Sequence, residues 1–191
     1  NAGLNGNYSV TITNALGCTS TSANIPVTIL PVPTAGITTS GATTFCEGGS
    51  VVLTGTGGNT YIWNSNINGS TITATQAGTY VVTAYAANGC SDAAEVIVNV
   101  NEVPSGSFIL DGNTVLCPGS TVLIQASGTP GCTYQWIRNG LPISGAVNAN
   151  YSANQSGSIQ VIATSAAGCQ STSNPITVTV LSANLQANGP T

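Results

Sequence analysis

The sequence of 191 residues holds one basic residue, Arg138, with no Lys and no His, and its formal net charge is -4. Proteins bind polyanions by releasing counterions onto several Lys or Arg side chains, so this composition argues against nucleic acid and against anionic lipid as partners. Without His or Lys the chain also lacks the bases that activate catalytic Ser and Cys nucleophiles, and we expect no enzyme activity and no cofactor. No apolar run approaches the length that spans a bilayer, so we expect no membrane insertion in this segment.

The first predicted element is a β-hairpin over residues 5–30, and closely similar segments recur over residues 77–100 and 156–180. Each copy has a Gly, a short run that alternates apolar and polar residues, a turn of small residues that ends in Gly-Cys, and a second alternating run. A period of two places one set of side chains on a buried face and the other in water. The turn cysteines lie 72 and 79 residues apart, which is the size of one small all-β domain; they are Cys18, Cys90 and Cys169.

This repeat length divides the chain into successive β-domains joined by short linkers that contain proline. We predict the C-terminal part of a domain over residues 1–31, whole domains over 32–102 and 103–181, and a linker or the start of a further domain over 182–191. Short linkers with proline are stiff and favour an elongated array. Because residue 1 falls inside a repeat, we expect the sequence to be a piece of a longer array.

The two whole repeats show the same order of alternating runs, so their positions can be matched. Thr and Val are abundant and suit pleated strands, whereas helix formers are scarce, and we predict essentially no helix. The later repeat is longer, and its extra residues follow its Trp in an expected surface loop. The matched positions are Cys46 with Cys117, Leu53 with Leu123, and Trp63 with Trp136.

Trp63 in a central strand, followed by Gly78 and Tyr80 at a strand corner, resembles the immunoglobulin-type sandwich. The resemblance implies two packed sheets with a buried tryptophan, and a corner tyrosine whose hydroxyl bonds to the backbone. The corner tyrosine is kept in the first copy as Tyr8 and is replaced in the third by Ile159. The disulfide that joins the two sheets in antibody domains is missing, and we expect apolar packing at its positions instead. Those positions fall on Leu53 with Val82, and on Leu123 with Val161.

The finer pattern resembles the tandem immunoglobulin-like repeats of very large secreted adhesins of gliding bacteria, which the type IX secretion system exports. It consists of Cys-x-Gly early in the repeat, Tyr-x-Trp in the middle and Gly-x-Tyr followed by Gly-Cys late. The resemblance implies a non-enzymatic structural or adhesive segment of an extracellular, cell-surface protein. It also implies self-association or neighbouring repeats in a filament as partners, with a surface glycan or a solid substrate as a further target.

The alternative function is a glycan-binding or spacer module of a secreted polysaccharide-degrading enzyme. In each Tyr-x-Trp the two aromatic side chains project to the same face, and the resemblance places the tryptophan in the core, so core packing is favoured over a platform for stacking sugars. Tyr85 and Tyr151 lie out of phase or in a loop, and they are the better candidates for exposed contacts.

The six cysteines, in a chain without His, favour an oxidising compartment over a zinc site. In each whole repeat one cysteine precedes the second strand and another follows the hairpin turn, so we predict the disulfides Cys46–Cys90 and Cys117–Cys169. Cys18 then lacks a partner. Cys132 is interpreted as a small buried residue with a free thiol, or as a residue that bonds across chains or to Cys18 of a neighbour.

The acidic residues offer little chemistry. Asp92 and Glu95 are the only close pair, and three residues apart in a strand they point to opposite faces, which suits a solvated strand edge and not a glycosidase. Calcium at the domain joints would need Glu102 and Asp111, with help from Glu47 or Glu95. Calcium prefers six to eight oxygen ligands and the sequence has no D-x-D cluster, so we expect no metal site.

Overall fold

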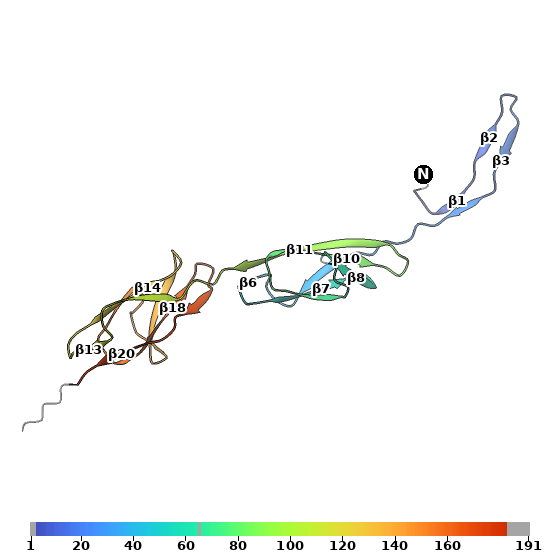
Figure 1. Ribbon diagram of the computed structural model, residues 1–191. Helices are drawn as coiled ribbons and strands as arrows, with labels where there is room; N and C mark the ends of the chain where they lie inside the picture. The colour runs from blue at the N-terminus through green and yellow to red at the C-terminus, as the bar shows by residue number, and fades with distance from the viewer. Residues whose placement is uncertain (1–2, 65, 183–191) are drawn as a thin grey trace, which may run out of the picture. The chain divides into compact units, whose positions relative to one another are not determined.

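The computed structural model of the chain describes residues 3–64 and 66–182 (Figure 1). These residues form strands, turns and loops, and none of them lies in a helix. They divide into two compact units: the described residues up to Thr43 with Ser50–Asn99, and Thr44–Gly49 with the described residues from Val100 onward. The predicted last segment, 182–191, lies outside the described residues except for its first residue.

The first hairpin of the sequence forms as predicted, with two short ladders of antiparallel strands. Thr11 pairs with Thr21 and Tyr8 with Ile25, so both runs of the repeat lie side by side. Its apolar side chains remain exposed, because the strands that cover the equivalent hairpins in the later repeats have no counterpart in residues 3–30. The strands are β1 (Gly6–Tyr8), β2 (Thr11–Thr13), β3 (Thr19–Thr21) and β4 (Ile25–Val27).

The second repeat contributes two sheets. The first has the strand order β5-β7-β9, and the second contains β11, β10 and β8 in that order. The short strand β6 belongs to the second unit, where the Glu47 N–H donates to the carbonyl of Asn101 at the end of β11. The strands are β5 (Gly36–Thr39), β6 (Thr44–Cys46), β7 (Val51–Thr56), β8 (Thr60–Trp63), β9 (Thr71–Ala74), β10 (Gly78–Tyr85) and β11 (Ser91–Asn101).

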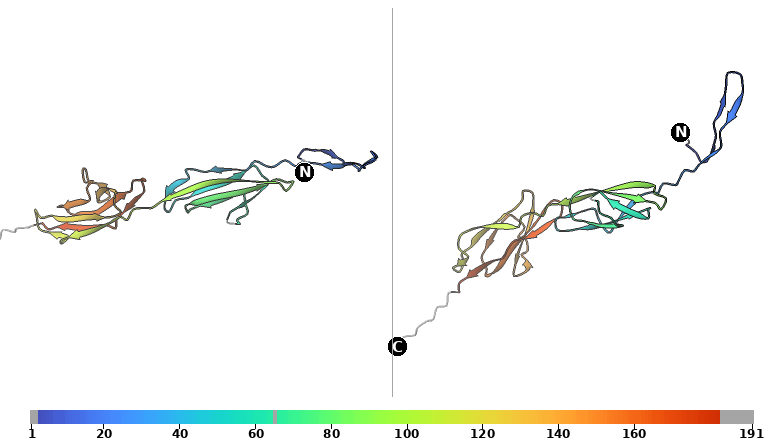
Figure 2. Two further views of the ribbon diagram at one scale, coloured as in Figure 1. Left: turned by 90° about the horizontal axis from the view of Figure 1, so that it is seen from above. Right: turned by 45° about the vertical axis from the view of Figure 1, so that its right-hand side comes forward.

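The third repeat has the same two sheets, which can be followed in Figure 2. One has the order β12-β14-β17 and the other β13-β20-β18-β15-β16, with β19 also paired to β18. The pair of β13 with β20 is parallel, whereas the other pairs of this repeat are antiparallel. The strands are β12 (Ser107–Asp111), β13 (Val115–Leu116), β14 (Val122–Ser127), β15 (Thr133–Arg138), β16 (Leu141–Pro142), β17 (Asn150–Ala153), β18 (Gly157–Thr164), β19 (Gln170–Thr172) and β20 (Ile176–Val180).

The core of the third repeat lies between its two sheets. Val122 and Ile124 of one sheet meet Trp136, Val161 and Val178 of the other in one buried cluster. The two sheets therefore pack face to face. The first two strands of the repeat are divided between them: β12 belongs to one sheet, and β13 belongs to the other, where it runs parallel to β20. This arrangement is an immunoglobulin-like β-sandwich, and the predicted all-β fold is confirmed.

The predicted core tryptophans are buried in both whole repeats, and each has a hydrogen bond for its ring nitrogen. Nε1 of Trp63 donates to the carbonyl of Gly69 at 3.0 Å, and Nε1 of Trp136 donates to that of Asn148 at 2.9 Å. Burying an indole N–H without a hydrogen-bond acceptor would destabilise the folded state, because the N–H loses its bond to water. These two hydrogen bonds therefore allow the tryptophan side chains to be buried in the core.

Leu123 does not occupy the predicted core position. It is 38% exposed, while the neighbouring Ile124 is fully buried and stands in the sheet where Leu53 does in the second repeat. Leu53 pairs with Ile72 and Ile124 pairs with Tyr151, each on the middle strand of its three-stranded sheet. A slip of one residue in matching the repeats moves a side chain to the opposite face, and this slip made the prediction wrong.

The predicted tyrosine corners are present. The Tyr80 hydroxyl donates to the carbonyl of Gln76 at 3.0 Å, and the Tyr8 hydroxyl donates to that of Leu4 at 2.9 Å. In the third repeat Ile159 is fully buried, so apolar packing takes the place of this bond.

We expect Tyr80→Phe to lower the free energy of unfolding by about 1 kcal/mol, the usual net value of one hydrogen bond. Denaturant unfolding followed by tryptophan fluorescence measures this change. Tyr85→Phe is the matched control, since within the described part of the chain the Tyr85 hydroxyl has no hydrogen-bond partner. Equal losses from both variants would contradict a specific role for the corner bond.

Candidate functional site: the two turns that carry cysteine

The hairpin turn that ends in cysteine has the same backbone geometry in all three copies. In each, the first residue donates its N–H to the carbonyl of the cysteine and accepts a bond from the N–H of the glycine. We call these segments the hairpin turns. The N–H to carbonyl pairs that close them are Asn14 to Cys18 at 3.0 Å, Ala86 to Cys90 at 2.8 Å and Ser165 to Cys169 at 2.8 Å.

In each of the two whole repeats another cysteine, which comes earlier in the sequence, begins a different turn. We call this turn the glycine turn. Gly49 N–H donates to the carbonyl of Cys46 at 2.9 Å, and Ser120 N–H donates to that of Cys117 at 3.0 Å. The third residue has a positive φ in both, 87° in Gly48 and 84° in Gly119. This is the geometry of a type II turn, which requires glycine at that position, and it explains the Cys-x-Gly pattern.

One disulfide joins a glycine turn to a hairpin turn. It links Cys46 to Cys169 with a Cα–Cα distance of 5.6 Å and a sequence separation of 123 residues. Both cysteines belong to the second unit. In the sequence, Cys46 lies in the glycine turn of repeat 32–102, and Cys169 lies in the hairpin turn of repeat 103–181. Cys90 and Cys117 are free thiols, so the predicted pairs Cys46–Cys90 and Cys117–Cys169 are replaced by a different bond.

The cysteines of one repeat lie at opposite ends of its sandwich. In the third repeat Thr164, at one end of β18, pairs with Gln170 beside Cys169. At the other end Gly157 pairs with Val178, and the following residues of β20 lie next to the strand that leads into Cys117. β18 has 8 residues, about 25 Å at roughly 3.3 Å per residue. A disulfide needs Cα atoms within about 7 Å, so the predicted pair cannot form.

The second repeat has the same arrangement. Cys90 comes directly before β11, whereas the residue after Cys46 is bonded to Asn101 at the far end of β11. The strand has 11 residues, about 35 Å at roughly 3.3 Å per residue. The two turns therefore mark opposite ends of both whole repeats.

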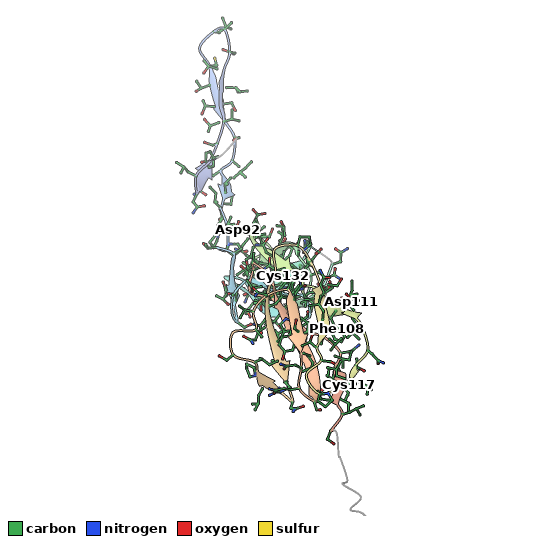
Figure 3. All side chains as sticks on the ribbon, turned by 90° about the vertical axis from the view of Figure 1, so that its left-hand side faces the viewer. Asp92, Phe108, Asp111, Cys117 and Cys132 are labelled. Atoms are coloured by element: carbon green, nitrogen blue, oxygen red, sulfur yellow. A yellow bond between two sulfur atoms is a disulfide. The ribbon has the colours of Figure 1, made fainter. Side chains whose placement is uncertain are left out.

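The two remaining cysteines are also free thiols. Cys18 is exposed in the first hairpin turn, and Cys132 is half-buried. In Figure 3 Cys132 and Cys117 are labelled toward opposite ends of the second unit. This agrees with the pairing of Thr133, next to Cys132, with Thr164 at the hairpin-turn end.

In each of the two whole repeats, the hairpin-turn end also contacts the linker that enters the repeat. In the first unit the Ala35 N–H donates to Oδ2 of Asp92 at 2.9 Å, and Nδ2 of Asn88 donates to the carbonyl of Pro31 at 2.9 Å. A Cβ on Gly57 would lie 1.7 Å from the carbonyl oxygen of Thr34, so only glycine admits this approach of the linker. Asp92 thus anchors the linker, a role that the sequence did not indicate because the contact spans 57 residues.

The third repeat repeats these contacts with different side chains. A Cβ on Gly128 would lie 2.8 Å from the carbonyl oxygen of Ser105, as Gly57 does with Thr34. Ser171 replaces Asp92 and lies against Gly106, where a Cβ would be 2.6 Å from its hydroxyl oxygen. The Ser171 hydroxyl is buried without a hydrogen-bond partner within the second unit as described. In this repeat the hairpin turn is bonded through Cys169 to Cys46.

We expect Asp92→Ala to lower the free energy of unfolding by about 1 to 3 kcal/mol, because the half-buried carboxylate that accepts the hydrogen bond of the Ala35 N–H is lost. The change should also make residues 31–35 more susceptible to proteases of broad specificity, measured by limited proteolysis and mass spectrometry. Glu95→Ala is the matched control, since Glu95 is exposed on the opposite face of β11. An equal cleavage rate in the two variants would contradict the anchoring role.

The other predicted candidates form no second site. Asp92 is half-buried and Glu95 exposed, on opposite faces of the strand as predicted. Across residues 3–64 and 66–182, no three acidic or cysteine side chains come together to hold a metal ion. Tyr151 is half-buried and stacks on Trp136 with ring centroids 5.5 Å apart, so the prediction that it makes exposed contacts is wrong. Tyr85 is half-buried as well.

A shallow hollow of about 410 Å³ lies along β8, lined by Asn59, Tyr61 and Asn68 among others. The Tyr61 hydroxyl is already engaged, since it donates to the Gly58 carbonyl at 2.7 Å and accepts from the Gly58 N–H at 3.0 Å. The one basic side chain, Arg138, donates to Oε1 of Gln155 in the second unit. Neither place combines the acid and base that catalysis requires.

The chain matches no protein-family model and no curated protein. Among solved structures it is similar to extracellular domains 3–5 of Drosophila OTK, with 15% identity, 93% of this chain and 72% of that chain covered, and a TM-score of 0.47. It is also similar to the I67–I69 fragment of titin, with 18% identity, 80% and 66% coverage and a TM-score of 0.42. A third similar structure comes from a 1.5-MDa bacterial ice-binding adhesin, with 16% identity, 78% and 65% coverage and a TM-score of 0.36. In the described residues no helix is long and apolar enough to cross a membrane.

Proposed function

We propose that the chain is a non-enzymatic structural segment of a long extracellular cell-surface protein, in which successive repeats build a filament or an adhesin. The disulfide between Cys46 and Cys169 carries the proposal, because it joins one sequence repeat covalently to the next. Independent binding modules on a flexible string have no need of such a bond. A segment that transmits tension along its length gains from it.

Other features of the chain support this function. Disulfides persist in oxidising compartments, which fits an extracellular location. A surface with one basic residue offers a single cleavage site to trypsin-like proteases, and its neutral polar side chains let copies pack side by side without charge repulsion. The repeat frame of 32–102 and 103–181, and the resemblance to the adhesins of gliding bacteria, extend the proposal to an elongated array exported by the type IX secretion system.

The proposal is tested with antibodies raised against the whole 191-residue chain. They should label intact, unpermeabilised cells that produce the protein, and negative-stain microscopy of shed surface material should show thin labelled fibres. Labelling that appears only after permeabilisation would contradict it. Selective binding of the chain to a glycan array would instead favour a module of a polysaccharide-degrading enzyme.

A further inference from the structure

The cysteines that are free in this chain occupy the same two positions as the cysteines that are bonded. Cys90 and Cys18 close hairpin turns with the same backbone bonds as Cys169, and Cys117 precedes a glycine turn with the same bonds as Cys46. The bonded pair joins the glycine turn of one repeat to the hairpin turn of the repeat that follows in sequence. The glycine-turn cysteine of this link comes from the earlier repeat, and the hairpin-turn cysteine comes from the later one. The free cysteines Cys18, Cys90 and Cys117 occupy the positions from which further links of the same kind would form.

We propose that every junction between consecutive repeats carries the same disulfide, so that the array is cross-linked from repeat to repeat. Cys117 is the attachment point for the hairpin-turn cysteine of a following repeat. Cys90 is the attachment point for the glycine-turn cysteine of a preceding repeat, and Cys18 has the same role one repeat earlier. This proposal rests on the oxidising compartment of the proposed function.

The exposure of the free thiols, and their position at the ends of the repeats, agree with these roles. Cys117 is exposed at the end of the third repeat where Leu181 leaves it, since the Leu181 N–H donates to the carbonyl of Leu116 at 2.8 Å. A following repeat would begin at this same end. Cys90 is half-buried at the hairpin-turn end of its repeat, where Asn88 holds the incoming linker at Pro31. Each thiol thus lies where the chain enters or leaves its repeat.

The chemistry of each junction is a two-electron oxidation. Two thiols lose two protons and two electrons, one S–S bond forms, and a small-molecule disulfide such as oxidised glutathione is reduced to two thiols. The linker that joins consecutive repeats holds the two cysteines near each other, so the second exchange step is intramolecular and outcompetes bonding to other chains. Cys132 has no counterpart in the repeat before it, where Asn59 stands, and it is left out of the scheme.

The test uses the full chain and a lengthened chain in which residues 31–182 are repeated directly after Leu181. Both carry Cys132→Ser to remove the unmatched thiol, are oxidised with glutathione, alkylated, and digested without reduction for mass spectrometry. In the full chain Cys46 should be linked to Cys169, with Cys90 and Cys117 alkylated. The lengthened chain should give a new peptide that links Cys90 to Cys117 in monomeric protein, and the alkylated fraction of Cys117 should fall by about half.

A second lengthened chain with Cys117→Ser in the first copy is the matched control and should lose the new peptide. Full alkylation of Cys90 and Cys117 in the lengthened chain would overturn the proposal, as would bonds from Cys46 to Cys90 or from Cys117 to Cys169. These outcomes do not depend on where the protein resides, so failure here is distinguishable from failure of the surface location.

Discussion

Pulled from its two ends, the oxidised chain should extend about 400 Å less than the reduced chain, since residues between Cys46 and Cys169 remain inside a closed loop. The two cysteines are 123 residues apart in the sequence, and an extended chain gains about 3.5 Å per residue. Tension then passes through the disulfide and not through the strands inside the loop. Force spectroscopy at constant velocity, with and without reductant, measures the difference in contour length.

The disulfide should be reduced more slowly in the folded protein than after unfolding. Cys169 is 1% exposed, so a small thiol cannot reach its sulfur, and Cys46 is half-buried. Added reductant should therefore release the length held inside the loop mainly after the unfolding peaks. A variant with Cys46→Ala and Cys169→Ala is the control, and it should reach full length with or without reductant. Two separate deficits of about 150 to 190 Å would instead indicate bonds within each repeat, whose loops are about 45 to 53 residues long.

The bond also couples the stability of the segments that it joins. By the loop-entropy estimate, closing a loop of this length removes about 5 kcal/mol of unfolded-state conformational freedom. This stabilisation also reaches repeat 32–102, because the glycine turn of that repeat belongs to the second unit. A repeat that begins to open under tension is thereby held by its neighbour.

Features set by local spacing could be predicted from the sequence. The alternation around Tyr80 and the spacing of the Gly-Cys turns are properties of neighbouring residues, and they indicated the hairpins. The tyrosine corners and the core tryptophans were predicted from the resemblance to the immunoglobulin-type sandwich, which is also carried by short local motifs.

The contacts that make up the candidate site could not be predicted in this way. Which cysteines meet depends on the end of the sandwich at which each turn lies, and the order of the strands along the chain does not reveal this. Pairing Cys46 with Cys90 relied on chain order alone, whereas β11 separates them by its full length. The anchoring of Ala35 by Asp92 is equally remote in sequence, and an isolated acidic residue in a strand carries no local signal of it.

The register of the third repeat leads to the second large effect. We expect Ile124→Ala to lower the free energy of unfolding by about 2 to 5 kcal/mol, because a fully buried side chain is lost and a cavity remains beside Trp136. Leu123→Ala removes a side chain of the same volume from the next position on β14. Because Leu123 faces outward, we expect that variant to lose less than about 1 kcal/mol.

Denaturant unfolding of the full chain, monitored by near-ultraviolet circular dichroism, gives both values under one set of conditions. The two variants share strand, volume and chemistry, so the ratio of their effects reports only which face of β14 is buried. If Leu123→Ala proved the more damaging, β14 would be shifted by one residue. The ladders Val122–Ala153 and Ile124–Tyr151 would then be misplaced, and with them the packing of Ile124 in the buried cluster that contains Trp136.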